Sequence, residues 1–183
     1  MPLIPSYLEF EGLISLPNTL PTKASGELLG LLLTSCTDEI LTDVLGYELY
    51  QLLVTNEAQG SGIYHDLIAG VEFTDSLGRL NKWMGFTRGY NPIANYTYFR
   101  FIQQTATVTT GLGEKGTNSE NMIAASAVTK ANRAWNKMAD WLTVLHDYLI
   151  INKADYPTYI GINYSPYDKG NANSKYFQKL TFL

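Results

Sequence analysis

One stretch of the chain, residues 119–151, constrains the fold more than any other, because its 33 residues contain no Gly or Pro. Apolar residues recur in it at alternating spacings of four and three, which predicts one long helix with a buried stripe. At 1.5 Å per residue this helix is about 50 Å long, more than a small compact domain needs, so its ends are expected to contact different partners. The stripe consists of Ala124, Val128, Ala131, Trp135, Met138, Leu142, Leu145 and Leu149.

Further helices are predicted before this stretch. A short apolar helix is expected from Glu27 to about Ser35, and Thr37, which is followed by two acidic residues, predicts the start of a second one. Gly46 ends or bends the second helix, whose apolar face continues as far as Val54. A short helix over residues 63–71 is also expected.

Turn signals place the next elements. The turn at 75–78 precedes a strand-like piece, residues 80–86, and indicates a hairpin. Asn91 before Pro92 predicts a capped helix start, and apolar residues follow at three-to-four spacing up to residue 106. The Thr-rich segment 105–110 and the glycines at 111, 113 and 116 then predict a second hairpin or a protruding loop.

These signals predict a mainly α fold in a single domain of 183 residues. The expected body is a small helical bundle over residues 27–152, with a loop at 107–117. Prolines at positions 2, 5, 17 and 21 predict an extended N-terminal arm over residues 1–26. Residues 153–183 combine Pro and Gly with many tyrosines, which predicts an extended C-terminal arm suited to docking on a neighbouring protein. The alternative is a tail that folds against its own domain or is partly disordered.

Charge is distributed unevenly along the sequence. Residues 1–75 carry eleven acidic side chains and one basic one, a net charge of −10, whereas residues 76–183 carry a net +6. If the two segments form different faces, the acidic face of one subunit can bind the basic face of the next, and such a contact closes into a ring when the rotation permits. The alternative is that both segments interleave in one globule.

Catalytic, metal and cofactor motifs are not found in the sequence, so no enzyme activity, metal or cofactor is expected. The only enzymatic candidates are His65, Asp66 and the single cysteine, Cys36, which is more simply explained as a buried apolar residue. Lys130, Arg133 and Lys137 form a basic stripe on the long helix. Three charges are few for a nucleic-acid site, so a solvated face or a subunit contact is favoured. No membrane span is expected.

Several loose motifs, taken in order, resemble the small head-to-tail connector proteins of tailed bacteriophages, particularly those infecting Bacteroidetes hosts. The resemblance spans nearly the whole chain, from the Pro-rich arm to the Tyr-rich tail. Its motifs are EILTDVLG at 39–46, Leu49-Tyr50, WMGF at 83–86, YTYF at 96–99, Thr-Thr-Gly at 109–111 and WNKM at 135–138.

The resemblance implies a virion adaptor, about twelve copies of which form a ring below the portal protein and extend the DNA channel. DNA then passes through the lumen without specific binding, and the subunits are in the host cytoplasm during assembly. It further implies that the tail docks on the portal or a neighbour through Tyr156, Tyr159, Tyr164, Tyr167, Tyr176 and Phe177. A loop with Thr109, Leu112, Glu114 and Lys115 would project toward the lumen or the next ring.

Alternatives remain open at this stage. A tail-completion or tail-terminator protein shares the ring arrangement but contacts the tail tube instead of the portal. An enzyme or a nucleic-acid-binding helical module is a less favoured reading of the same sequence.

Overall fold

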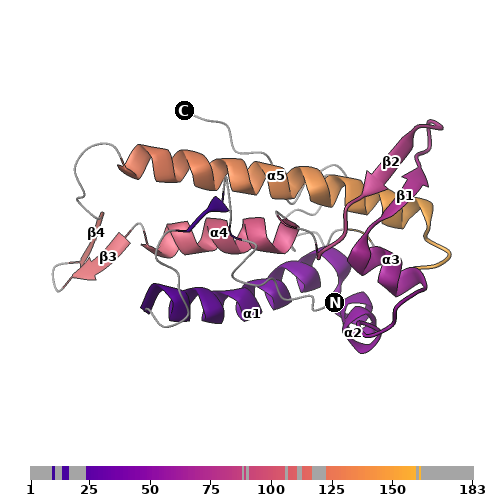
Figure 1. Cartoon of the computed structure of the whole chain (residues 1–183), viewed down its shortest axis with the longest axis horizontal. Coiled ribbons are helices and arrows are strands. Elements are labelled where there is room, and N and C mark those ends of the chain that lie inside the picture. Colours follow the sequence, from indigo (N-terminus) through magenta and orange to yellow (C-terminus); the bar gives the residue numbers. More distant parts are fainter. Residues whose placement is uncertain are drawn as a thin grey trace, which may run out of the picture.

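Three long helices lie side by side and form the body of the protein, with α4 (Pro92–Thr105) between α1 (Ala24–Leu45) and α5 (Ile123–Ile151) (Figure 1). α1 and α5 run in the same direction and α4 runs in the opposite one. This mainly helical architecture confirms the predicted fold class. The computed structural model describes residues 10, 14–16, 24–87, 89, 91–105, 107–110, 113–116, 123–159 and 161.

The first helix is continuous where the sequence predicted two. Thr37 does not cap a new helix, because its hydroxyl donates a 2.6 Å hydrogen bond to the carbonyl of Leu33, one turn earlier in the same helix. The predicted boundary near Ser35 is therefore wrong. α1 ends before Gly46, whose φ of 79° breaks the helix, and α2 (Tyr47–Thr55) follows at once.

The middle helix begins as predicted. The side-chain oxygen of Asn91 accepts a 2.8 Å hydrogen bond from the backbone N–H of Ala94, and Pro92 occupies the first helical position. Every residue from Pro92 to Tyr98 is buried, because α1 and α5 cover this part of α4 on two sides. α4 is thus the centre of the hydrophobic core.

A β-hairpin packs across the C-terminal part of α5. After the short helix α3 (Ile63–Ala69), strands β1 (Val71–Thr74) and β2 (Leu80–Trp83) pair antiparallel with Val71 opposite Trp83. The helix predicted over 63–71 therefore ends two residues early. The hairpin is fixed by Trp83, which is fully buried, donates a 2.7 Å hydrogen bond to the carbonyl of Leu67 and packs edge-on against Trp141 of α5.

The second predicted hairpin is confirmed at the other end of the helical layer (Figure 1). Strands β3 (Thr107–Thr110) and β4 (Gly113–Gly116) pair antiparallel, with Thr109 opposite Glu114 and Val108 opposite Lys115. The hairpin connects α4 to α5 and reverses the chain direction between them.

α5 spans Ile123–Ile151, and the first four residues of the predicted helix, 119–122, lie outside the described residues. Its 29 residues make a rod of about 44 Å. The buried stripe is confirmed for Ala131, Met138, Leu142, Leu145 and Leu149. Trp135, expected in the core, is only partly buried and lies against Phe99 of α4, with ring centroids 4.8 Å apart. Ala124 and Val128 lie outside the residues whose side chains are described.

Candidate assembly interface

The segment that follows α5 turns back onto the body. The side chain of Asn152 donates a 2.8 Å hydrogen bond to the carbonyl of Tyr148 and closes the last turn of α5. Successive backbone turns follow, from Tyr156 N–H to Asn152 and from Tyr159 N–H to Tyr156. Tyr156 and Tyr159 consequently have exposed fractions of 1% and 0%.

Hydrogen bonds anchor both tyrosines inside the protein. The Tyr156 hydroxyl donates to the carbonyl of Ile63 at 2.7 Å, so its 3.0 Å contact with the Tyr148 hydroxyl has Tyr148 as donor. The Tyr159 hydroxyl lies 2.8 Å from Nδ1 of His146. Burial is the main reason that the pKa values of Tyr156 and Tyr159 are raised.

These contacts correct the prediction for two of the proposed docking residues. Tyr156 and Tyr159 belong to the core, and residues 153–159 belong to the body, because the Tyr156 hydroxyl bonds to α3 and the Tyr159 hydroxyl to His146 of α5. The other predicted docking residues, Tyr164, Tyr167, Tyr176 and Phe177, lie outside the described residues. At the N-terminus, Phe10, Ile14 and Leu16 are likewise buried, so these three positions of the predicted arm contact the body.

The residues predicted to face the lumen lie on the β3–β4 hairpin. Thr109 is in β3, Glu114 and Lys115 are in β4, and Leu112 lies outside the described residues. The hairpin occupies one end of the helical layer (Figure 1), a position from which a loop can reach another ring. Their predicted role stays a prediction.

A basic edge runs along the N-terminal half of α5. Lys130, Arg133 and Lys137 are all exposed and lie at i, i+3 and i+7, which places them on one face of the helix. No acidic side chain occurs between Ile123 and Ala139 in α5. This half of the helix therefore presents a net charge of +3 on its outer side. We call these three residues the basic edge.

An acidic edge runs along α1. The helix contains four acidic residues and no basic one. Asp38 is exposed and accepts a 2.5 Å hydrogen bond from the hydroxyl of Tyr50, and Glu39 lies 3.9 Å from Arg100 of α4. The pKa of Asp43 is raised, first by burial and then by Glu39. We call Glu27, Asp38, Glu39 and Asp43 the acidic edge; Glu27 and Asp38 share the outer face of α1, whereas Glu39 turns toward Arg100 of α4.

α1, which carries the acidic edge, and α5, which carries the basic edge, lie on opposite sides of α4 (Figure 1). The charged residues of α1 are all acidic, whereas α5 carries the basic edge in its N-terminal half and Asp140 and Asp147 in its C-terminal half. Opposite charges also pair within the chain: Glu72 pairs with Lys82 and Asp75 with Arg79 on the β1–β2 hairpin, and Glu39 lies 3.9 Å from Arg100. α1 and the N-terminal half of α5 therefore carry net charges of opposite sign.

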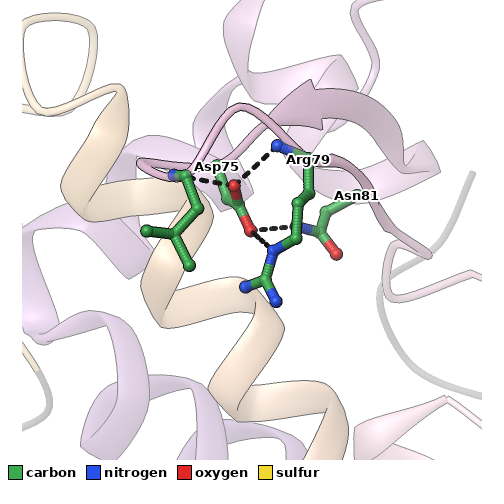
Figure 2. Close-up of polar contacts among 4 residues, drawn as sticks. Asp75, Arg79 and Asn81 are labelled. Carbon is green, nitrogen blue, oxygen red and sulfur yellow. Dashed lines mark hydrogen bonds and ion pairs between the residues drawn. The ribbon is translucent and has the colours of Figure 1, made fainter.

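The tip of the β1–β2 hairpin is a surface that the sequence analysis did not single out. The Asp75 carboxylate accepts hydrogen bonds from the backbone N–H groups of Leu77 and Arg79, at 2.9 and 2.8 Å. Its other oxygen accepts from Nε of Arg79 at 2.7 Å and from Asn81 at 2.9 Å. Figure 2 shows this carboxylate at the centre of the turn. The sequence signal for this turn is Asp75 followed by Gly78, since Asp and Gly are both typical turn residues.

This fixed turn displays apolar side chains. Leu77 and Leu80 are each 73% exposed, although the turn between them is held by four hydrogen bonds to one carboxylate. These bonds also lower the pKa of Asp75, with the backbone N–H of Arg79 as the largest cause. The tip is therefore an ordered apolar projection at neutral pH.

The enzymatic candidates are scattered. Cys36 is buried in α1, and burial raises the pKa of its thiol, which disfavours the reactive thiolate. His65 and Asp66 are neighbours on α3, and His146 is hydrogen-bonded to Tyr159. Among the residues that the structure describes, no three His, Cys, Asp or Glu side chains are placed to hold a metal ion.

A family model matches residues 41–169, which is more than half of the chain, and its description is "Family of unknown function (DUF6712)". The chain belongs to the DUF6712 family. The matched region of this DUF6712 protein includes both hairpins, α4 and the basic edge of α5, and it begins near the end of α1. No curated protein and no solved structure gave a significant match. Within the described part of the chain, none of the helices has the length and apolar character of a membrane span.

Proposed function

We propose that the protein is a structural subunit of a phage particle, a head-to-tail connector that forms a ring below the portal and extends the DNA channel. The observation that carries this proposal is a helical layer with an acidic edge on one side and a basic edge on the other. Such a subunit is complementary to a copy of itself, and repeated head-to-tail contacts of this kind build rings. The resemblance to connector proteins supplies the biological setting.

Other features support the same function. The overall net charge of −4 suits a conduit through which DNA slides, because a strongly basic lining would bind phosphates and release counterions. The ordered tip with Leu77 and Leu80, at one end of the layer, and the β3–β4 hairpin at the other give each subunit two projections for contacts above and below a ring.

Binding to the portal protein of the same phage tests the proposal. Purified full-length protein is mixed with portal rings or with tail-tube protein and separated by sedimentation, and purified particles are assayed for the chain by mass spectrometry. We expect the chain in particles and co-sedimentation with the portal. Its absence from particles contradicts the proposal, and binding to tail-tube protein alone identifies a tail-completion or tail-terminator protein instead.

A further inference from the structure

We infer that the acidic edge of α1 binds the basic edge of α5 in a second copy of this chain, at the same height along the helices, so that repetition closes a flat ring. The inference rests on the ring assembly proposed above and names the surfaces that build it. The occupant of each edge is thus a second copy, and complementary charge is the first argument for it.

The middle helix shows that the two edges lie at equal height. On one side of α4, Arg100 approaches Glu39 of α1 at 3.9 Å. On the other side, Phe99 packs against Trp135 of α5 with ring centroids 4.8 Å apart. Because Phe99 and Arg100 are consecutive, Glu39 and Trp135 contact the same turn of α4 from its two sides.

The charged residues sit close to this shared level. Asp38 directly precedes Glu39, and Arg133 and Lys137 flank Trp135 by two residues on each side, or about 3 Å of helix rise. Since α1 and α5 also run in the same direction (Figure 1), the acidic and basic residues meet when one copy is placed beside the other without a shift along the helices.

Equal height decides between a ring and a filament. A head-to-tail contact between identical subunits gives a closed ring when the operation is a pure rotation, and a helical filament when it includes a rise. Complementary edges at different heights would impose a rise at every contact. Here the levels coincide, so the contact is compatible with rotation about an axis parallel to the helices.

The acidic edge has the make-up of a protein contact surface. Leu31 is 74% exposed and lies four residues after Glu27 and seven before Asp38, on the same outer face of α1. An apolar centre with charged residues around it is the usual pattern of protein interfaces. The Tyr50 hydroxyl orients the Asp38 carboxylate, and the guanidinium of Arg133 is suited to pair with a carboxylate.

Charge reversal on each edge tests the inference in solution. The mass of the full-length protein is measured by light scattering and native mass spectrometry at low salt, for wild type, for Asp38→Lys and for Arg133→Glu/Lys137→Glu. We expect a closed oligomer for wild type and loss of this species to the 20.4 kDa monomer in each variant. Mixing the two variants should restore rings with alternating subunits, because each then meets an opposite charge.

Two controls separate charge from local structure. Tyr50→Phe removes the hydrogen bond to Asp38 but keeps its charge, and Lys153→Glu reverses an exposed charge beyond the end of α5. Both should retain the wild-type oligomer. Circular dichroism verifies that the variants fold.

Three results would overturn the inference: a wild-type monomer at high concentration and low salt, rings that survive both reversals, or reversed variants that fold but do not reassemble on mixing. Binding of the chain to portal rings in any of these cases leaves the proposed connector function standing. Loss of portal binding with rings intact would reject that function and keep the inferred contact.

Discussion

The hydroxyl of Tyr156 donates a 2.7 Å hydrogen bond to the backbone carbonyl of Ile63, which lies 93 positions earlier in the chain. The bond joins the turn after α5 to the first residue of α3, and the Tyr148 hydroxyl donates to the same tyrosine oxygen. A short segment beyond the longest helix therefore fastens the α3 region to the body.

Tyr156→Phe should destabilise the protein by about 1 to 3 kcal/mol, because it leaves the partly buried Ile63 carbonyl and the buried Tyr148 hydroxyl without this partner. Tyr148→Phe is the matched control and should cost less, about 0.5 to 1.5 kcal/mol, since the bond from Tyr156 to Ile63 remains. Urea denaturation measures both. Equal stability of Tyr156→Phe and wild type would show that this bond does not hold the segment.

Two truncations test how much Tyr156 and Tyr159 contribute to stability. Removing residues 156–183 deletes two fully buried tyrosines and should cost at least about 3 kcal/mol, the scale for losing a large buried aromatic side chain. Removing only residues 162–183 keeps every contact described above and should melt close to full length. Melting curves followed by circular dichroism compare the two truncated proteins. Equal melting temperatures would show that Tyr156 and Tyr159 do not stabilise the body.

The sequence did not reveal the burial of these tyrosines for a physical reason. Residues 153–161 have no apolar period, because turns rather than a helix or strand bring Tyr156 and Tyr159 inward. Tyrosine suits either an interface or a core, since its ring is apolar and its hydroxyl needs a partner. Only the distant partners, Ile63 and His146, decide which applies, and they cannot be read locally.

Gly70→Ala and Gly85→Ala should each cost on the order of 3 kcal/mol. Both glycines have positive φ, and an added Cβ would lie 2.6 Å from the Trp83 carbonyl oxygen at Gly70 and 2.5 Å from that of Ile68 at Gly85. Gly78→Ala is the control: Gly78 also has a positive φ but open space around it, and the variant should cost about 1 kcal/mol. Denaturation measures the loss of stability at each site. Similar losses at all three sites would contradict the close approach of the Gly70 and Gly85 backbones to neighbouring backbone atoms.

Replacing two tryptophans should give unequal losses of stability. Trp83→Ala removes a fully buried ring with a 2.7 Å hydrogen bond and should cost about 3 to 5 kcal/mol. Trp135→Ala removes a partly buried ring and should cost about 1 to 3 kcal/mol. Chemical denaturation of both variants checks the order. A larger loss at Trp135 would place it in the core, as the apolar spacing had suggested.

Regular apolar spacing and local capping residues were the sequence features that predicted structure correctly. The period of α5 and the Asn91 cap are set by neighbouring residues, so they were predicted. Thr37 was misjudged because its hydroxyl can cap a helix or bond one turn back within it. The basic edge was found from spacing alone. The position of the basic edge along the helix axis relative to Glu39 could not be predicted, because it depends on how Phe99 and Arg100 of α4 contact α5 and α1.

The hairpin tip should lose order in acid. The folded-state pKa of Asp75 is lowered, so its contribution to stability is present above the ordinary pKa of about 3.9 and is lost as pH falls through the folded value. Hydrogen exchange of the Leu77 and Arg79 amides between pH 5 and pH 2 measures this. Asp75→Asn should remove the pH dependence, and unchanged protection of wild type in acid would contradict the role of Asp75.

An image of the assembled protein at side-chain resolution tests the central claim most directly. It should show a closed ring in which α1 of each subunit faces α5 of the next, with Asp38 at ion-pair distance from Arg133 or Lys137 and no rise between subunits. A ring whose contacts leave both charged edges in solvent, or a filament with a rise at each step, would contradict the account.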